Sequence, residues 1–121
     1  MTTSKLSVED YAGVTLVKFA ESSILETAVI EQLGRDLCHL IDAEHKRKLV
    51  LDFSNVKFLS SHALGILLTL HRKAAETKGA IVLCGMRSEL KKVFTITSLD
   101  KVFKFCRDDA EALASFGVRV D

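Results

Sequence analysis

Two short and nearly uninterrupted apolar runs, KLVLDF at 48–53 and GAIVLCGM at 79–86, constrain the fold most strongly. Each run is long enough for one strand and too short for a helix. Runs without polar alternation are typical of strands that are buried on both faces, as in the middle of a parallel sheet. Parallel neighbours need a crossover connection, and the residues between the two runs have helical spacing. We therefore predict an α/β fold with these runs at the centre of the sheet.

Two β-rich segments precede these runs, at residues 5–11 and 14–19. Ala12 and Gly13 separate them, which predicts a β-hairpin with the glycine in its turn. In the segment that follows, Ser23 and Glu26 match a capping box, so we expect a helix that begins near Ile24. The apolar stripe predicted for this helix comprises Leu25, Val29, Leu33, Leu37, Leu40 and Ile41.

The second half of the chain alternates between helical and strand patterns. A helix is expected from about Ser61, a further helix over 88–99 with Ser88 as N-cap, and a last strand over 101–106. Asp108 and Glu111 form a capping box for a closing helix, and Gly117 follows its end. The predicted order is β-β-α-β-α-β-α-β-α, a mixed sheet with about four helices. The second helix is predicted to bury Leu64, Leu67, Leu68 and Ala75.

Composition limits the classes of function. The 121 residues match the size of one domain, and we expect residues 1–121 to form a single unit. With 17 basic and 16 acidic side chains, the chain lacks the excess of positive charge that nucleic-acid binding or a polybasic membrane contact requires. We recognise no transmembrane segment and no signal peptide. The expectation is a cytoplasmic protein without enzyme activity and without a cofactor.

The cysteines give no sign of a disulfide or metal site. Cys38, Cys84 and Cys106 are widely spaced, and their odd number leaves one unpaired in any disulfide scheme. No pair of cysteines or histidines has the spacing of zinc ligands. We therefore expect reduced thiols and no bound metal.

A polar stretch, Ser60-Ser61-His62, follows the run at 48–53 and opens the second predicted helix. In sheets of this kind, functional groups gather where strands end and helices begin. One of the serines is expected to cap the helix, because the first N–H groups of a helix need acceptors. Helical spacing places His62 on the polar side of the helix, together with Gly65, Thr69, Arg72, Lys73 and Glu76.

The stretch LVLDFSNVKFLSSHALGILL, residues 49–68, resembles the signature of the STAS domain, the fold of bacterial anti-sigma factor antagonists. The order of elements agrees over essentially the whole chain. The resemblance implies a regulatory protein that binds an anti-sigma factor with serine kinase activity and so frees a sigma factor. In the phosphorylated members, one serine at the start of the second helix is modified and binding ends. The matching positions are Asp52, Ser54, Val56, Phe58, Ser61, Leu64 and Gly65.

Three positions depart from the family pattern: the motif aspartate falls on Ser60, the usual acceptor serine falls on His62, and the glycine that follows is Ala63, which the family often tolerates. Three interpretations remain open: constitutive binding, phosphorylation of Ser61 or Ser60 in a shifted frame, or regulation of His62 by phosphorylation or protonation. A hydrogen-bonding role is expected for Asp52, which with Ser54 and Phe58 would structure the loop before the helix. All three interpretations share one predicted partner-binding surface, made of Ser60, Ser61, His62, Gly65, Thr69, Arg72 and Lys73.

Two other classes of protein stay open. One is a scaffold STAS subunit, in a signalling assembly or beside a membrane transport system. The other is a response-regulator receiver, in which Asp52 would accept a phosphoryl group and Glu9 and Asp10 would hold Mg²⁺. A receiver has a helix between its first two strands, and the spacing between 5–11 and 14–19 leaves no room for one. The sequence indicates neither the identity of the partner nor the oligomeric state.

Overall fold

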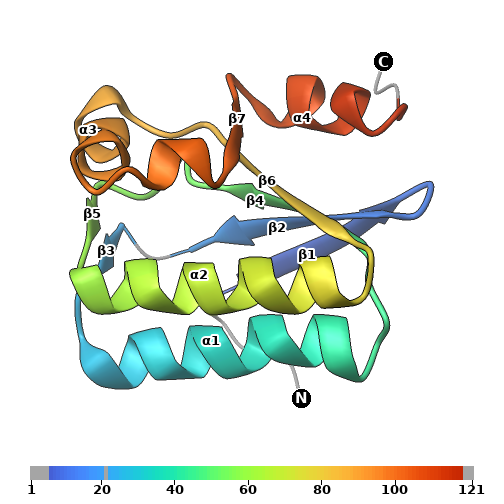
Figure 1. The fold of residues 1–121 in the computed structure, drawn as a ribbon, viewed down its shortest axis with the longest axis horizontal. Helices are drawn as coiled ribbons and strands as arrows, with labels where there is room; N and C mark the ends of the chain where they lie inside the picture. Colours follow the sequence, from blue (N-terminus) through green and yellow to red (C-terminus); the bar gives the residue numbers. More distant parts are fainter. Residues whose placement is uncertain (1–5, 21, 119–121) are drawn as a thin grey trace.

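The computed structural model describes residues 6–20 and 22–118, and its main feature is a five-stranded mixed sheet (Figure 1). Strand β1 is antiparallel to β2, and the remaining pairs are parallel. This arrangement confirms the predicted mixed α/β fold. In spatial order the strands are β1 (Leu6–Tyr11), β2 (Val14–Phe19), β4 (Lys48–Asp52), β6 (Ala80–Cys84) and β7 (Lys104–Cys106).

Helices cover both faces of this sheet. In Figure 1, α1 and α2 lie side by side along one face and α4 lies on the other. After the carboxyl end of β4 the chain passes through a short loop and strand β5 (Phe58–Leu59), and the α2 helix begins two residues later. The helical elements are α1 (Thr27–Asp42), α2 (Ser61–Glu76), α3 (Ser88–Ile96), the 3-10 turn η1 (Leu99–Lys101) and α4 (Asp109–Ser115).

Two hydrophobic cores hold these layers together. The larger core lies between the sheet and α1, α2 and α3, and it includes the fully buried Phe53, Leu83 and Phe94. The smaller core lies under α4 and contains Cys84 and Cys106, which are neighbours in the β6–β7 ladder. None of the helices among the described residues is long and apolar enough to cross a bilayer.

The predicted hairpin is confirmed, with Tyr11 opposite Val14 and a two-residue turn between them. Ala12 and Gly13 have φ angles of 50° and 88°, as a type I′ turn requires at both central positions. The glycine adopts this conformation at little cost, because it has no Cβ. The predicted first strand began at Lys5, which lies outside the described residues.

The predicted start of the first helix is wrong. Ser23 and Ile24 form a short strand, β3, which pairs in parallel with β5 (Phe58–Leu59). Helix α1 begins at Thr27, and Glu26 is its N-cap without a side-chain hydrogen bond. Leu25, assigned to the core stripe, is 51% exposed. Pairing with β5 keeps residues 23–24 extended, and this tertiary contact overrides the local capping pattern.

Three further boundaries differ from the prediction. Helix α3 ends at Ile96, because Ser98 adopts a left-handed conformation with φ 61° and η1 follows it. The N-cap of α3 is Arg87, and Ser88 is its first helical residue. Strand β7 contains only three residues. The buried side of α2 also differs from the prediction, because Leu68 is half-buried and Ala75 is exposed. The buried residues of α2 are Ala63, Leu64, Leu67, Leu70 and Ala74.

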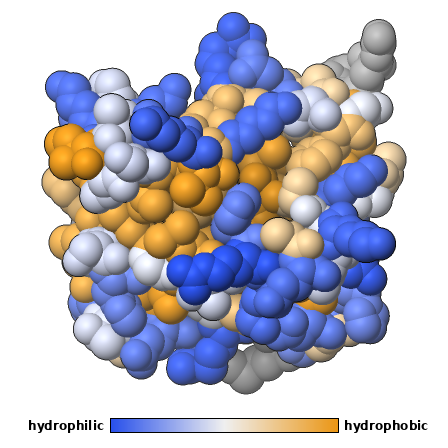
Figure 2. Space-filling model, in the orientation of Figure 1, coloured by the Kyte–Doolittle hydropathy of each residue, from blue (hydrophilic) through white to orange (hydrophobic). Residues whose placement is uncertain are grey.

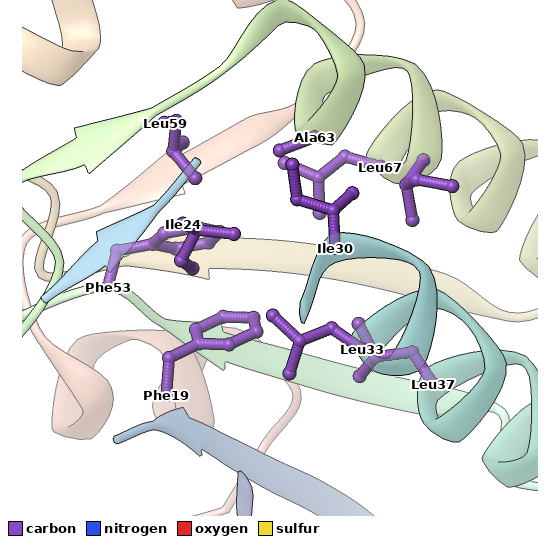
Figure 3. A pocket seen from close by; sticks show the side chains of 10 residues that line it. Phe19, Ile24, Ile30, Leu33, Leu37, Phe53, Leu59, Ala63 and Leu67 are labelled. Atoms are coloured by element: carbon purple, nitrogen blue, oxygen red, sulfur yellow. The ribbon is translucent and has the colours of Figure 1, made fainter. Parts of the chain in front are cut away.

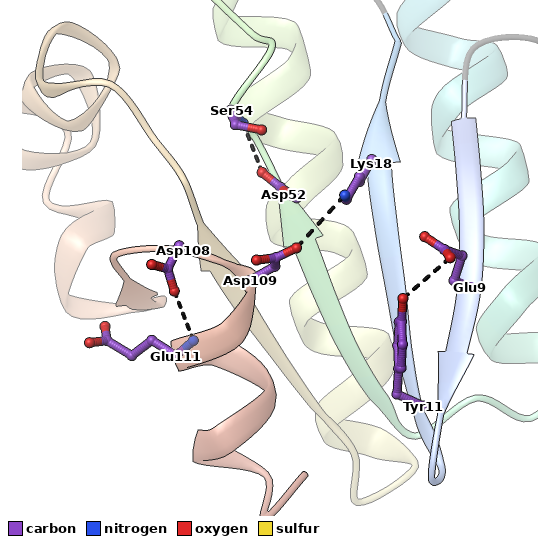
Figure 4. Close-up of polar contacts among 8 residues, drawn as sticks. All are labelled: Glu9, Tyr11, Lys18, Asp52, Ser54, Asp108, Asp109 and Glu111. Atoms are coloured by element: carbon purple, nitrogen blue, oxygen red, sulfur yellow. Dashed lines mark hydrogen bonds and ion pairs between the residues drawn. The ribbon is translucent and has the colours of Figure 1, made fainter. Parts of the chain in front are cut away.

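The closing helix matches its prediction. The Asp108 carboxylate accepts a hydrogen bond from the Glu111 N–H at 2.9 Å (Figure 4), and the Glu111 carboxylate accepts from the Arg107 N–H at 2.8 Å. The N–H groups of Gly117 and Val118 bond to carbonyls of the last turn, with Gly117 at φ +87°. These local contacts fix α4 over the smaller core.

Leu83 provides a direct test of the larger core. The Leu83→Ala variant should lose about 2–5 kcal/mol of unfolding free energy, because its side chain is fully buried in a central strand. Ile96→Ala is the matched control, since Ile96 is 81% exposed and should change stability by less than about 0.5 kcal/mol. Urea unfolding followed by circular dichroism measures both values. Equal losses for the two variants would contradict this core.

Candidate partner-binding site

Asp52 determines how the chain leaves the central strand β4. The residue is 6% exposed, and its Oδ1 accepts a hydrogen bond from the Ser54 N–H at 2.9 Å (Figure 4). The Phe53 N–H donates to the Cys84 carbonyl, and the Val56 N–H donates to the Phe53 carbonyl, each at 2.9 Å. The Ser54 side chain itself is exposed, so this serine contributes to the loop through its backbone.

Gly85, at the end of β6, makes room for this carboxylate. A Cβ atom at this position would lie 2.7 Å from Asp52 Oδ1 and 3.2 Å from Ser54 N. Its φ of +68° is also a conformation that favours glycine. The sequence contained Cys84-Gly85, but nothing in it linked this glycine to Asp52.

The loop then pairs with the segment before α1. The N–H groups of Lys57 and Phe58 donate to the Ser22 carbonyl at 2.7 and 3.2 Å, and the Ser60 N–H donates to the Ile24 carbonyl at 3.2 Å. The Phe58 ring is 56% exposed. Phe58 therefore structures the loop through its backbone, while its ring faces solvent next to the start of α2.

The two serines at the start of α2 have different environments. Ser60 is the N-cap, and its Oγ accepts a hydrogen bond from the Ala63 N–H at 3.2 Å. Ser61 is the first residue of the helix and is exposed. The fold thus uses the hydroxyl of Ser60 and leaves that of Ser61 at the surface.

His62 is exposed and faces the neighbouring helix. Its Nε2 lies 4.0 Å from Glu31 Oε2 of α1, with 48% of the His62 side chain exposed. When the imidazole is protonated, the two groups form an ion pair across the α1–α2 seam. A carboxylate therefore stands beside the position where the family pattern places its acceptor serine.

The remaining predicted residues lie along the outer side of α2. Gly65 is exposed, and no atom would lie within 4 Å of a Cβ added there, so packing does not require a glycine. Thr69 donates to the Gly65 carbonyl at 3.2 Å, and Arg72 is exposed. Lys73 Nζ bonds to Asp42 Oδ2 at 2.9 Å, and this carboxylate raises the pKa of Lys73. The structure therefore places all seven predicted residues on one continuous stretch of α2 and its cap.

The sequence prediction missed Glu31 and Asp42, which border the same surface from α1. They are eleven positions apart, as are His62 and Lys73 on the parallel helix α2. The equal spacing was visible in the sequence, but a contact between the two helices was not.

A small apolar cavity of about 20 Å³ lies beneath the start of α2 (Figure 3). Ala63 and Leu67 approach it from α2, and Leu59 and Ile24 approach it from the paired short strands. All ten residues that line it are apolar, so it offers no group for acid–base or nucleophilic chemistry. A cavity of this size and character holds no organic ligand and has no partners for a water molecule.

The structure separates the carboxylates that a receiver would bring together. Asp10 is in register with Thr15 and, through β2, with Leu49, three residues before Asp52 in β4. Three residues of strand correspond to about 10 Å. Hydrogen bonds from Thr15 and Lys46 lower the pKa of Asp10, which is thereby engaged at the opposite end of the sheet. Among the described residues, no group of three or more metal-ligating side chains gathers.

The three cysteines form no disulfide with one another. Burial raises the pKa of the Cys84 thiol to about 12, with the nearby Asp52 carboxylate adding to the shift. Burial also raises the pKa of Cys106 and Cys38. A thiol with a raised pKa is a poor nucleophile at neutral pH.

The fold and this surface define a class of protein, a small α/β domain that presents polar groups at the start of a helix. The STAS domain family matches residues 5–112, and the chain belongs to this family.

Comparisons with individual proteins agree with this assignment. The chain is 25% identical to BtrV of Bordetella bronchiseptica, named as a candidate anti-sigma factor antagonist, over 93% of this chain and 94% of BtrV. Among solved structures, an anti-sigma-factor antagonist (STAS) domain protein from Planctomyces limnophilus superposes with a TM-score of 0.81 at 22% identity, over 94% of this chain and 98% of that one. A chain of the stressosome, described as a signal integration and transduction hub, superposes with a TM-score of 0.70 at 19% identity, over 92% and 96%.

The two serines allow a matched test of the capping assignment. Ser60→Ala should lower the unfolding free energy by about 1 kcal/mol, because the Ala63 N–H loses its acceptor. Ser61→Ala removes an exposed hydroxyl and should change it by less than about 0.5 kcal/mol. Chemical denaturation of both variants gives the difference. A larger loss for Ser61→Ala than for Ser60→Ala would show that the cap is assigned to the wrong serine.

Proposed function

We propose that this protein is an anti-sigma factor antagonist, which binds an anti-sigma factor of the serine kinase type and so regulates sigma-dependent transcription. Family membership and the name of BtrV support this function. The observation that carries it is the exposure of Ser61 and His62 in the first turn of α2, while Ser60 alone caps the helix. The fold does not need these two exposed side chains, so they are available for a partner.

The surroundings of His62 support constitutive binding, without phosphorylation of this residue, as the first of the three interpretations. A phosphoryl group on His62 Nε2 would stand against the Glu31 carboxylate, and two negative groups at this distance repel each other. Ser61 is the second candidate, because it is exposed and its hydroxyl does not cap the helix. Ser60 is less suited to modification, since its hydroxyl is engaged in the cap.

The exposed ring of Phe58 supports a protein as the partner. Large hydrophobic side chains at the surface are common in protein interfaces, and aromatic ones often contribute most of the binding energy. Phe58 is 56% exposed and lies two residues before the cap Ser60. We place the protein in the cytoplasm, because the proposed partner controls a sigma factor there.

A second candidate function is that of a scaffold subunit in a signalling assembly. The similarity in fold to a stressosome chain favours it. A scaffold would use the same domain without a regulated partner at the start of α2. The two functions therefore predict different results for charged substitutions at positions 61 and 62. An antagonist should lose its partner, and a scaffold should keep it.

The function is tested by affinity recovery of partners from the native cell lysate, with Ser61→Asp and His62→Glu beside wild type. Wild type should recover a protein with a kinase-type ATP-binding domain. Each charged variant should weaken its binding at least tenfold, since a new charge at a packed interface costs desolvation and repulsion. Mass spectrometry of the recovered bait identifies any phosphorylated residue.

Ser7→Asp is the matched control for this experiment, because Ser7 is exposed on the edge strand β1, away from α2. It should recover the same partner as wild type. Identical recovery by wild type and both charged variants would contradict the proposed site and favour the scaffold function.

A further inference from the structure

A second surface of the molecule is apolar and adjoins the outer side of α2. Figure 2 shows a broad hydrophobic area in the region where Figure 1 places α2 opposite η1 and α3. The ring contact of His71 in α2 with Phe103, 5.3 Å between centroids, joins the two sides of this area. Exposed hydrophobic areas on a soluble protein commonly mark sites of protein interaction.

The residues at this place account for the apolar character. On α2, Leu68 is only half-buried and Ala75 is exposed. On the other side, Leu99 of η1 is half-buried and Val102, directly after η1, is 38% exposed. Ile96, at the end of α3, is 81% exposed. We call the surface formed by Leu68, Ala75, Leu99 and Val102 the α2–η1 face.

More of the charged side chains around the α2–η1 face are basic than acidic. Beside the four residues of this face, the exposed charged side chains are the basic Arg72, Lys101 and Lys104 and the acidic Glu76 and Asp100. Lys101 and Lys104 flank Val102, and Arg72 follows Leu68 by one turn of α2. Lys91 lies 5.9 Å from the centre of the Phe105 ring. Residues 9–44 have the opposite balance, with eight acidic and two basic side chains.

We propose that the α2–η1 face binds an acidic amphipathic helix of a protein partner. The apolar strip between α2 and η1 would receive the apolar side of such a helix. The basic side chains at its border would meet acidic residues, which adds specificity and speeds association. The proposal rests on the proposed function in one respect: the helix belongs to the anti-sigma factor that also contacts the start of α2.

The test uses a synthetic 18-residue amphipathic helix of Leu, Ala and Glu, titrated into ¹⁵N-labelled protein. Saturable shifts of backbone resonances in residues 68–75 and 96–105 are expected. Lys101→Glu/Lys104→Glu should raise the dissociation constant at least tenfold, and Val102→Ser about threefold to tenfold. The matched controls are Arg35→Glu, an exposed residue of α1, and Val8→Ser, which removes a side chain that is 43% exposed on β1. Both controls should stay within twofold of wild type.

Four results would overturn the proposal: no saturable shifts at millimolar peptide, shifts at other residues, equal binding of the peptide with Glu replaced by Lys, or controls that behave like the test variants. Light scattering tests a second copy of the chain as the occupant. Concentration-dependent dimers that Lys101→Glu/Lys104→Glu abolishes would be a fifth result against the proposal. The outcome is separate from that for the start of α2. If the peptide does not bind but Ser61→Asp loses the partner, the proposed function stands and the α2–η1 face is wrong. If the peptide binds the α2–η1 face but Ser61→Asp keeps the partner, the face stands and the proposed function is wrong.

Discussion

The candidate site depends on the hydrogen bond between the buried Asp52 carboxylate and the Ser54 N–H. This contact turns the chain out of the sheet at the end of β4, and Gly85 leaves the space in which the carboxylate fits. The loop then pairs with residues 22–24 through backbone hydrogen bonds, which fixes the position of Ser60. Because Ser60 caps α2, the direction of the first turn of the helix follows from the same contact. The presentation of Ser61 and His62 at the surface is therefore a consequence of a bond several residues away.

Of the three polar residues at the start of α2, Ser60 has a structural role, and Ser61 and His62 lie at the surface. A helix needs one acceptor for its first free N–H groups, and Ser60 provides it. The next two side chains are released from that task and point to solvent, with the Glu31 carboxylate close to His62. A carboxylate at this distance opposes the addition of further negative charge. The local electrostatics thus favour binding that persists without phosphorylation of His62.

Much of the fold follows from patterns that are local in sequence. The apolar runs at 48–53 and 79–86, the Ala12-Gly13 turn and the capping residues of α4 each act over a few positions, and the structure contains all of them. The missed features depend on contacts between distant segments. Strands β3 and β5 have two residues each, too few for a periodic pattern, and their pairing removes the capping box expected at Ser23. Glu31 and Gly85 became site residues only when the helices and strands were placed beside one another.

The outer side of α2 borders both proposed contact surfaces, the exposed start of the helix and the α2–η1 face. A partner that binds across them would bury backbone from β5 to η1 and leave the edge strand β1 and helix α4 exposed. Hydrogen–deuterium exchange of the protein alone and in complex with the recovered partner measures this footprint directly. The account predicts slower exchange in residues 58–73 and 96–105, with β1 and α4 unchanged. Protection confined to β1 or α4 would contradict it and place the functional surface on the opposite side of the molecule.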